Sequence, residues 1–202
     1  MPTIGLTGNF GMGKTTVLAL FRKSGAFTFN IDKFVHDILK EPQMIKKISY
    51  ALGEDILIKN TKLSINKARV AKIIFNDVDK RKLLEKIIHP RVLKIIKATR
   101  SEILKKNPSA LIIFEIPLLF EAGYEKYFDK TLVVYCNRKT AMNRLVKKGF
   151  SKDEALKRLR VQMPITRKKK LADFVITNNY DIENTEKQVR RILEKIKQLR
   201  SR

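Results

Sequence analysis

Short apolar runs alternate along this chain with longer stretches in which apolar residues recur every three or four positions. The runs over 110–116 and 131–136 are continuous, which is typical of strands covered on both faces of a parallel sheet. Shorter runs over 3–7, 27–31 and 174–176 predict three further strands. The stretches between them predict helices over about 16–23, 32–40, 43–52, 64–76, 77–106, 138–148, 151–161, 165–172 and 182–199.

Strands that alternate with helices predict a doubly wound α/β fold around a parallel sheet. Asp77 is expected to cap the long helix over 77–106, and Pro90 is expected to kink or break it because proline lacks a backbone N–H. Sites in such folds lie beyond the carboxyl ends of the strands. The residues that follow each apolar run are therefore candidate site residues, at 8–15, 32, 117–121, 137–138 and 177–179.

The segment after the first strand is rich in glycine. Its sequence over residues 8–15, Gly-Asn-Phe-Gly-Met-Gly-Lys-Thr, fits the phosphate-binding pattern G-x-x-x-x-G-K-[ST]. A strand before the pattern and a helix after it supply the context in which such a loop binds phosphate. Gly8, Gly11 and Gly13 allow several backbone N–H groups to converge on one anion, and the helix N-terminus adds its dipole. The segment therefore predicts a P-loop that binds a nucleoside triphosphate.

The side chains at the start of the following helix fit the same chemistry. Lys14 is placed to reach the β- and γ-phosphates of ATP, Thr15 offers a hydroxyl to Mg²⁺, and Thr16 can donate to the α-phosphate. The residues expected to bind the nucleotide are Gly8, Asn9, Phe10, Gly11, Met12, Gly13, Lys14, Thr15, Thr16 and Asn178.

Two carboxylates follow predicted strands on the same edge of the sheet. Asp32 could take the proton from an attacking hydroxyl, or it could cap the helix that begins there. Glu115 ends an apolar run, where a charge is costly unless it is used. It could hold the Mg²⁺ shell together with Thr15, or it could be a strand residue at an edge.

Two further segments invite a functional interpretation. The loop over 117–121 is unusually apolar, so it could wall a pocket for a base or an acyl chain, or belong to the core. The helices that follow are rich in arginine. In small kinases, lid arginines close over the phosphates, so we expect one or two of these to do so and the rest to form an exposed basic face. The arginines are Arg138, Arg144, Arg158 and Arg160.

Composition narrows the class of protein. The chain has 202 residues, 44% of them hydrophobic, and a net charge of +24 from 44 basic and 20 acidic residues. A nucleic acid, a substrate with several phosphates and a solvated Lys-rich surface are all compatible with that charge. No apolar run reaches the roughly 18 residues that a membrane span needs, and no signal peptide is visible.

The cysteine and histidine content excludes two further classes of site. Cys136 is the single cysteine, so no internal disulfide can form, and its apolar run indicates a buried, inert thiol rather than a catalytic one. His36 and His89 are the only histidines, so we expect no zinc site. Together with the missing signal peptide, these features favour the cytoplasm.

A series of short segments occurs here in the order in which one enzyme family carries them. The P-loop begins the series, and Ile116-Pro-Leu-Leu-Phe-Glu121 is the most distinctive member. In these features the chain resembles the dephospho-CoA kinases over nearly its whole length. The other matching segments are 31–33, 52–57, 74–77, 89–90, 162–164 and 171–178.

The resemblance implies transfer of the ATP γ-phosphate to the ribose 3′-hydroxyl of 3′-dephospho-CoA, with Mg²⁺, giving CoA and ADP. It implies a five-stranded parallel core over about 1–32, 107–137 and 173–202, a helical substrate region over about 33–106 and a lid over about 138–172. A monomer or small homo-oligomer is expected, with no membrane partner and no specific nucleic acid.

The resemblance also implies roles for single residues. Asp32 is expected to be the base, and Arg144 is expected to face the phosphates and act with Lys14. Contacts with the acceptor are expected from Asp32, His89, Pro117, Leu118, Leu119, Phe120 and Glu121.

The chain departs from the family pattern at several positions. Asn30 stands where a second Asp is usual, which puts any two-carboxylate role in doubt. Lys148 replaces an arginine and lacks its bidentate fork. Thr15 keeps the hydroxyl of the usual serine. Because the P-loop glycines remain, we expect nucleotide binding despite the substituted residues Asn9, Phe10 and Met12.

Two rival interpretations remain from the residues themselves. A kinase for another small acceptor, such as a nucleoside monophosphate or shikimate, would share the P-loop, but the 117–121 segment and His89-Pro90 argue against it. A basic nucleic-acid-binding NTPase would fit the charge. However, the basic region over 138–170 contains a single aromatic residue, Phe150, for base stacking.

Overall fold

The computed structural model describes residues 2–59 and 63–198 of the chain. The chain divides into two compact units. Unit 1 comprises Met1–Asn30 and Ile103–Arg202, and unit 2 comprises Ile31–Glu102.

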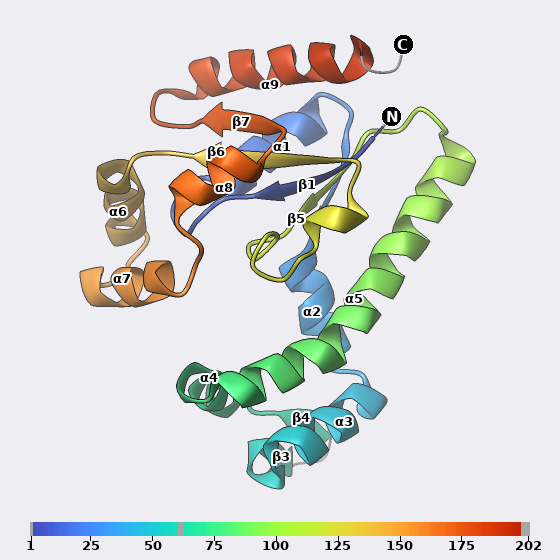
Figure 1. Ribbon diagram of the computed structural model, residues 1–202, viewed down its shortest axis with the longest axis vertical. Coiled ribbons are helices and arrows are strands. Elements are labelled where there is room, and N and C mark those ends of the chain that lie inside the picture. The colour runs from blue at the N-terminus through green and yellow to red at the C-terminus, as the bar shows by residue number, and fades with distance from the viewer. Residues whose placement is uncertain (1, 60–62, 199–202) are drawn as a thin grey trace. The chain divides into compact units, whose positions relative to one another are not determined.

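Unit 1 is built, within its described residues, on a parallel sheet of five strands. They are β1 (Thr3–Thr7), β2 (Phe27–Asn30), β5 (Ile112–Glu115), β6 (Lys130–Tyr135) and β7 (Phe174–Thr177). Their order is β2-β5-β1-β6-β7, and every neighbouring pair is parallel (Figure 1). β1 lies at the centre of the sheet, with β5 on one side and β6 on the other. The loop that follows β1 therefore starts at the place where ligands bind in such sheets.

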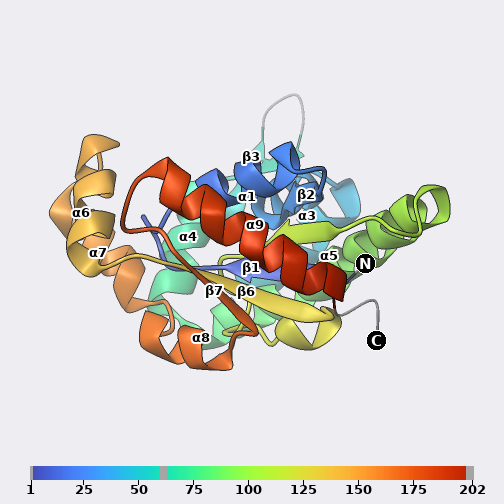
Figure 2. The ribbon, with the colours of Figure 1, turned by 90° about the horizontal axis from the view of Figure 1, so that it is seen from above.

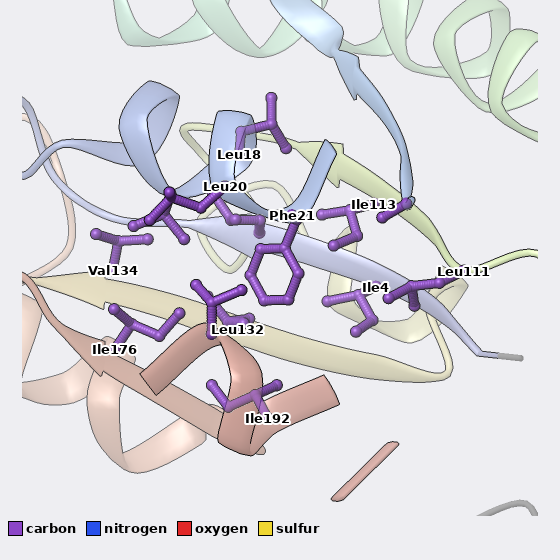
Figure 3. Close-up of a cluster of buried hydrophobic side chains, with 14 of the residues drawn as sticks. Ile4, Leu18, Leu20, Phe21, Leu111, Ile113, Leu132, Val134, Ile176 and Ile192 are labelled. Atoms are coloured by element: carbon purple, nitrogen blue, oxygen red, sulfur yellow. The ribbon is translucent and has the colours of Figure 1, made fainter. Parts of the chain in front are cut away.

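Helices cover both faces of this sheet. The helices α1 (Lys14–Lys23) and α9 (Ile182–Gln198) lie on one face, and α8 (Ile165–Leu171) lies on the other (Figure 2). Alternation along β1 explains this layering, because Ile4 and Leu6 face α1 and α9 in a buried cluster around Phe21 (Figure 3). Gly5 faces the opposite side, where a β-carbon would lie 2.9 Å from the side chain of Leu119.

Two more helices of unit 1 belong to the predicted lid. They are α6 (Arg138–Lys147) and α7 (Lys152–Arg160). Outside this region, the short 3₁₀ helix η2 (Glu125–Tyr127) precedes β6. Asn137 and Ser151 cap α6 and α7, since their side-chain oxygens accept hydrogen bonds from Thr140 N and Glu154 N.

Unit 2 is helical with one small hairpin. Ile48, Leu52 and Leu84 belong to its buried core. Its elements are α2 (Ile31–Ile38), α3 (Pro42–Leu52), η1 (Glu54–Ile56), β3 (Leu57–Lys59), β4 (Leu63–Ile65), α4 (Lys67–Asn76) and the larger part of α5 (Val78–Lys106).

The structure corrects two predictions for this unit. Residue Ser64 belongs to the antiparallel hairpin of β3 and β4, so the helix predicted from 64 begins only at Lys67, after the cap Asn66. The helix α5 continues through Pro90, so of the predicted kink or break the break is wrong. The cap at Asp77 is confirmed, because its Oδ1 accepts hydrogen bonds from Asp79 N and Lys80 N. The last residue of the predicted C-terminal helix, Leu199, lies outside the described residues.

No helix within residues 2–59 and 63–198 combines the length and the apolar character that a membrane crossing requires.

Asp173 connects the beginnings of two strands. Its carboxylate accepts hydrogen bonds from Thr131 N at 2.8 Å, from Thr131 Oγ1 at 2.9 Å and from Lys130 Nζ at 2.9 Å. Burial alone would raise the pKa of this carboxyl, but the hydrogen bonds from Lys130 and Thr131 outweigh it and hold the pKa below its usual value.

We expect Asp173→Asn to lower the free energy of unfolding at pH 7 by about 1–3 kcal/mol, because the amide reproduces only part of this acceptor set. Since the folded-state pKa of Asp173 is depressed, its carboxylate stabilises the protein above pH 3.8, and this stabilisation is lost as the pH falls through the folded-state pKa. Urea denaturation should therefore show the variant and the wild type converging in acid. Asp37→Asn, at an exposed ion pair, should leave the free energy of unfolding close to that of the wild type. A difference that persists unchanged in acid would contradict the assignment.

Candidate functional site

The glycines of the loop between β1 and α1 allow it to pack closely on its neighbours. A β-carbon on Gly8 would lie 2.4 Å from Val134 O, and one on Gly13 would lie 2.1 Å from Nδ2 of Asn178. Gly13 also has a φ of +87°, a conformation that side chains other than glycine rarely adopt. The predicted P-loop therefore depends on glycine at both ends.

Asn178 forms a hydrogen bond with the backbone of this loop. Its Nδ2 donates to Met12 O at 3.0 Å, and its Oδ1 accepts a hydrogen bond from Thr185 Oγ1 at 3.1 Å. Both side chains are buried. The predicted nucleotide residue Asn178 thus contacts the P-loop backbone.

The helix α1 begins at Lys14, directly after the left-handed Gly13. The first N–H groups of a helix have no partner within it, so they are available to an anion in front of the loop. Lys14 Nζ donates to Asn9 O at 3.3 Å, which folds its side chain over the loop. Thr15 and Thr16 are exposed on the first turn.

Arg144 brings a second cation to the P-loop. It lies on α6, and its NH1 is 3.4 Å from the position that a β-carbon on Gly13 would take. This nitrogen is buried, and no hydrogen-bond acceptor reaches it within the described part of the chain. A buried guanidinium N–H without an acceptor is costly and suits an anionic group.

Cys136 lies beneath the same loop. It is fully buried and packs with Met12 and Ala141. Burial raises the pKa of its thiol, and the nearby Arg144 opposes that shift only in part. The predicted burial of this thiol is therefore confirmed, and the raised pKa is consistent with the prediction that it is inert.

The predicted lid region contacts the P-loop through both backbone and side chains. Asn9 Nδ2 donates to Met163 O at 3.1 Å, and Phe10 N donates to Oε1 of Gln162 at 2.9 Å. The rings of Phe10 and Phe150 meet edge to face at 5.0 Å, and the guanidinium of Arg158 lies 5.0 Å from each ring.

The four lid arginines therefore fall into two groups. Arg144 and Arg158 approach the P-loop, whereas Arg138 and Arg160 are exposed, as is Lys148 at the end of α6. Gln162 and Met163 were not among the predicted site residues, although both lie in a segment that carries the resemblance.

Glu115 ends β5 beside the last residue of β2. It is 4% exposed, and its Oε2 accepts a hydrogen bond from Asn30 Nδ2 at 3.1 Å. Among the described residues, no three His, Cys, Asp or Glu side chains cluster as metal ligands. Mg²⁺ usually takes one or two protein oxygens together with waters and substrate phosphates, and the oxygens of Thr15 and Glu115 have the chemistry for that role.

The Pro117–Glu121 segment contains side chains in different environments. Leu119 is fully buried against Gly5 and belongs to the core, which corrects its assignment to an acceptor pocket, whereas Leu118 is 41% exposed. Phe120 is partly exposed. Lys168 anchors the segment, with its Nζ 3.1 Å from Pro117 O and 2.8 Å from Oε1 of Glu121.

Sequence reasoning missed Lys168. It belongs to the basic run over 167–170, in which nothing sets it apart from its neighbours by residue type. Lys168 lies three residues after Ile165 and four before Ala172, a spacing that places it on the inward side of a helix. This spacing is the one signal in the sequence for its burial.

Asp32 and His89 belong to unit 2. Asp32 lies exposed in the first turn of α2, which begins at Ile31, so the interpretation of Asp32 as the helix cap is wrong. His89 lies within α5, where burial lowers its pKa and Glu85 opposes the shift.

Unit 2 also contains a hollow of about 650 Å³ between α3 and α5. Arg91 forms a two-pronged ion pair with Glu41 at its wall, with nitrogen–oxygen distances of 2.7 and 3.0 Å. The other cations that line it are Lys47, Lys86 and Lys94.

Comparison with known proteins gives a consistent result. The family model for dephospho-CoA kinase matches residues 2–184. The chain belongs to the dephospho-CoA kinase family. A dephospho-CoA kinase of Aquifex aeolicus is 37% identical over 199 residues, which cover 97% of this chain and 98% of that protein.

Solved structures confirm the fold of this family member. The crystal structure of TT1252 from Thermus thermophilus superimposes with a TM-score of 0.81 at 29% identity, and the coverage is 96% of both chains. A dephospho-CoA kinase from Campylobacter jejuni gives a TM-score of 0.67 at 28% identity, again with 96% of both chains covered. The predicted α/β fold around a parallel sheet, and the predicted kinase family, are therefore confirmed.

The close approach of Gly13 in this kinase can be tested with a matched pair. Gly25 has a similar φ of +90°, but within the described structure nothing lies within 4 Å of an added β-carbon. We expect Gly25→Ala to cost about 1 kcal/mol of stability and to leave ATP affinity unchanged. Gly13→Ala should weaken ATP binding at least tenfold in calorimetric titration, because the methyl group displaces Asn178 or the loop. Equal ATP affinities of the two variants would contradict this account.

Proposed function

We propose that the protein transfers the γ-phosphate of ATP to the ribose 3′-hydroxyl of 3′-dephospho-CoA and releases CoA and ADP. The main support for this proposal is a buried N–H group of Arg144 that has no hydrogen-bond acceptor within the described part of the chain and lies beside the P-loop. The chain that carries it belongs to this kinase family. A phosphate oxygen in front of Gly13 would supply the missing acceptor. We also propose a cytoplasmic location, where ATP is present and the free thiol of Cys136 stays reduced. The protein is proposed to be a monomer or a small homo-oligomer.

Three groups of residues are proposed to act on the nucleotide. The P-loop amides and the N-terminus of α1 bind the phosphates, and Lys14 and Arg144 neutralise charge that develops as the phosphoryl group moves. Thr15 and Glu115 would hold Mg²⁺ or its waters. When bound, Mg²⁺ supplies charge neutralisation between the β- and γ-phosphates. The nucleotide residues proposed from the sequence, from Gly8 to Thr16, fit this arrangement.

Asp32 is proposed as the base. It follows Asn30, the last residue of β2, by two positions, and the carboxyl end of β2 belongs to the same sheet edge as the P-loop. An exposed carboxylate at the start of α2 can accept the proton of the attacking hydroxyl and orient it. This role does not require a second carboxylate, so it is compatible with Asn30.

We propose acceptor contacts in unit 2 and, separately, in the exposed part of the 117–121 segment of unit 1. The hollow between α3 and α5 carries four cationic side chains, which suit a molecule with a pyrophosphate. The exposed part of Leu118 and the partly exposed Phe120 offer apolar surface for the rest of the acceptor. His89 remains a proposed contact.

The reaction and its base can be tested together. With Mg²⁺, ATP and 3′-dephospho-CoA, the wild type should form CoA and ADP in equal amounts, as chromatography would show. Asp32→Asn should lower kcat about 10²-fold or more while ATP affinity is kept, because only the proton acceptor is lost. Asp37→Asn, on the same helix and exposed, should retain full turnover. A wild type that binds ATP but forms no CoA would refute the acceptor, and equal turnover of both variants would refute the base.

The role of Arg144 predicts a loss in turnover. Arg144→Met keeps much of the side-chain volume and removes the cation, so kcat should fall roughly 10²–10³-fold in the same assay. Lys147→Met removes an exposed charge from the same helix and should change kcat less than about twofold. If both variants lose the same small amount, general loss of positive charge explains the effect and the specific role is wrong.

A further inference from the structure

Lys168 is an unusual lysine because it is completely buried. It lies on α8 with 0% exposure, and the flanking Lys169 and Lys170 differ from it. Lys169 stacks on the ring of Tyr135 with Nζ 4.1 Å from the centroid, and Lys170 is exposed. A buried ammonium is costly unless it is paired and hydrogen-bonded, so its partners identify what it does.

One branch of contacts leads from Lys168 to the end of β1. Its Nζ donates to Pro117 O at 3.1 Å, and the same carbonyl accepts a hydrogen bond from Thr7 Oγ1 at 3.0 Å. Thr7 is the residue immediately before the P-loop. The two donors fix the first residue of the 117–121 segment against the strand that carries the P-loop.

A second branch leads from Lys168 to the tip of the P-loop. Its Nζ pairs with Oε1 of Glu121 at 2.8 Å, and this oxygen also accepts a hydrogen bond from Met163 N at 2.8 Å. Met163 O in turn accepts from Nδ2 of Asn9 at 3.1 Å, and Asn9 O accepts from Lys14 Nζ at 3.3 Å. The chain of contacts therefore ends at the lysine that is proposed to bind the transferred phosphate.

We propose that Lys168 is a positioning residue for phosphoryl transfer, whose buried ammonium couples the Pro117–Glu121 segment and the lid residue Met163 to the P-loop. The inference rests on the proposed function. It predicts that removing the ammonium shifts Met163 and Asn9, so that Lys14 meets the phosphates in a poorer geometry. A displacement of about 1 Å can cost on the order of 10²-fold in rate.

Three variants separate positioning from stability. Lys168→Met removes the charge at similar length and leaves Glu121 without its cation, so its melting temperature should fall. The double variant Lys168→Met/Glu121→Gln removes both charges and should regain most of that stability, because neutral pairs that replace buried ion pairs are often tolerated. Lys170→Met, on the same helix but exposed, is the control.

The measurements are kcat, KM for each substrate and ATP affinity by calorimetric titration, all well below the melting temperature of each variant. We expect the double variant to remain roughly tenfold to a hundredfold below the wild type in kcat, with ATP affinity weakened about tenfold, although its stability has returned. Lys170→Met should match the wild type. Activity that returns together with stability, or kinetic constants within twofold of the wild type, would overturn the proposal.

The ATP titration keeps this test separate from the identity of the acceptor. If the wild type forms no CoA, the proposed function fails, and the effect of Lys168 on nucleotide binding can still be measured. If ATP affinity in the double variant equals that of the wild type and CoA formation is also normal, the positioning role fails while the proposed function stands.

Discussion

The candidate site depends on how closely the P-loop packs on the strands beside it. Gly8 lies where any side chain would collide with Val134 O on β6, and Gly13 lies where one would collide with Asn178 after β7. Because these contacts come from two different strands, the loop is held by the sheet rather than by its own turn. The start of α1 at Lys14 and the direction of its first N–H groups follow from that placement.

The lid contributes to the same loop in two physically different ways. Arg158 forms an ion pair with Glu154 at 2.8 Å and also lies over the rings of Phe10 and Phe150, so its charge already has partners and its ring contacts connect α7 to the loop. Arg144 instead keeps a buried N–H without an acceptor. Arg158 is therefore already satisfied, whereas the N–H of Arg144 could donate to the phosphate that we propose there. This difference, which charge patterning along the chain cannot express, distinguishes Arg144 from its basic neighbours.

Most of the fold could be predicted because its elements follow local rules. The apolar runs of β5 and β6 and the cap at Asp77 depend on neighbours in sequence. The features that were not predicted do not follow from such local patterns. The β3–β4 hairpin has three-residue strands, which are too short for periodicity to reveal, and the helix α5 is not broken at Pro90. The burial of Lys168 depends on Glu121, far away in the sequence.

The candidate site was predictable to the extent that its residues belong to motifs. The P-loop and Arg144 came from sequence patterns, whereas the contacts that support them, through Gln162 and Met163, required the fold. Asn30, which departs from the family pattern, shows why. In register it lies beside Glu115, and its amide donates to that carboxylate at 3.1 Å. An aspartate at position 30 would place a second carboxylate there and could not donate when ionised. The substitution therefore replaces a repulsive pair with a hydrogen bond to Glu115, and the proposed base Asp32 follows two residues later in the chain.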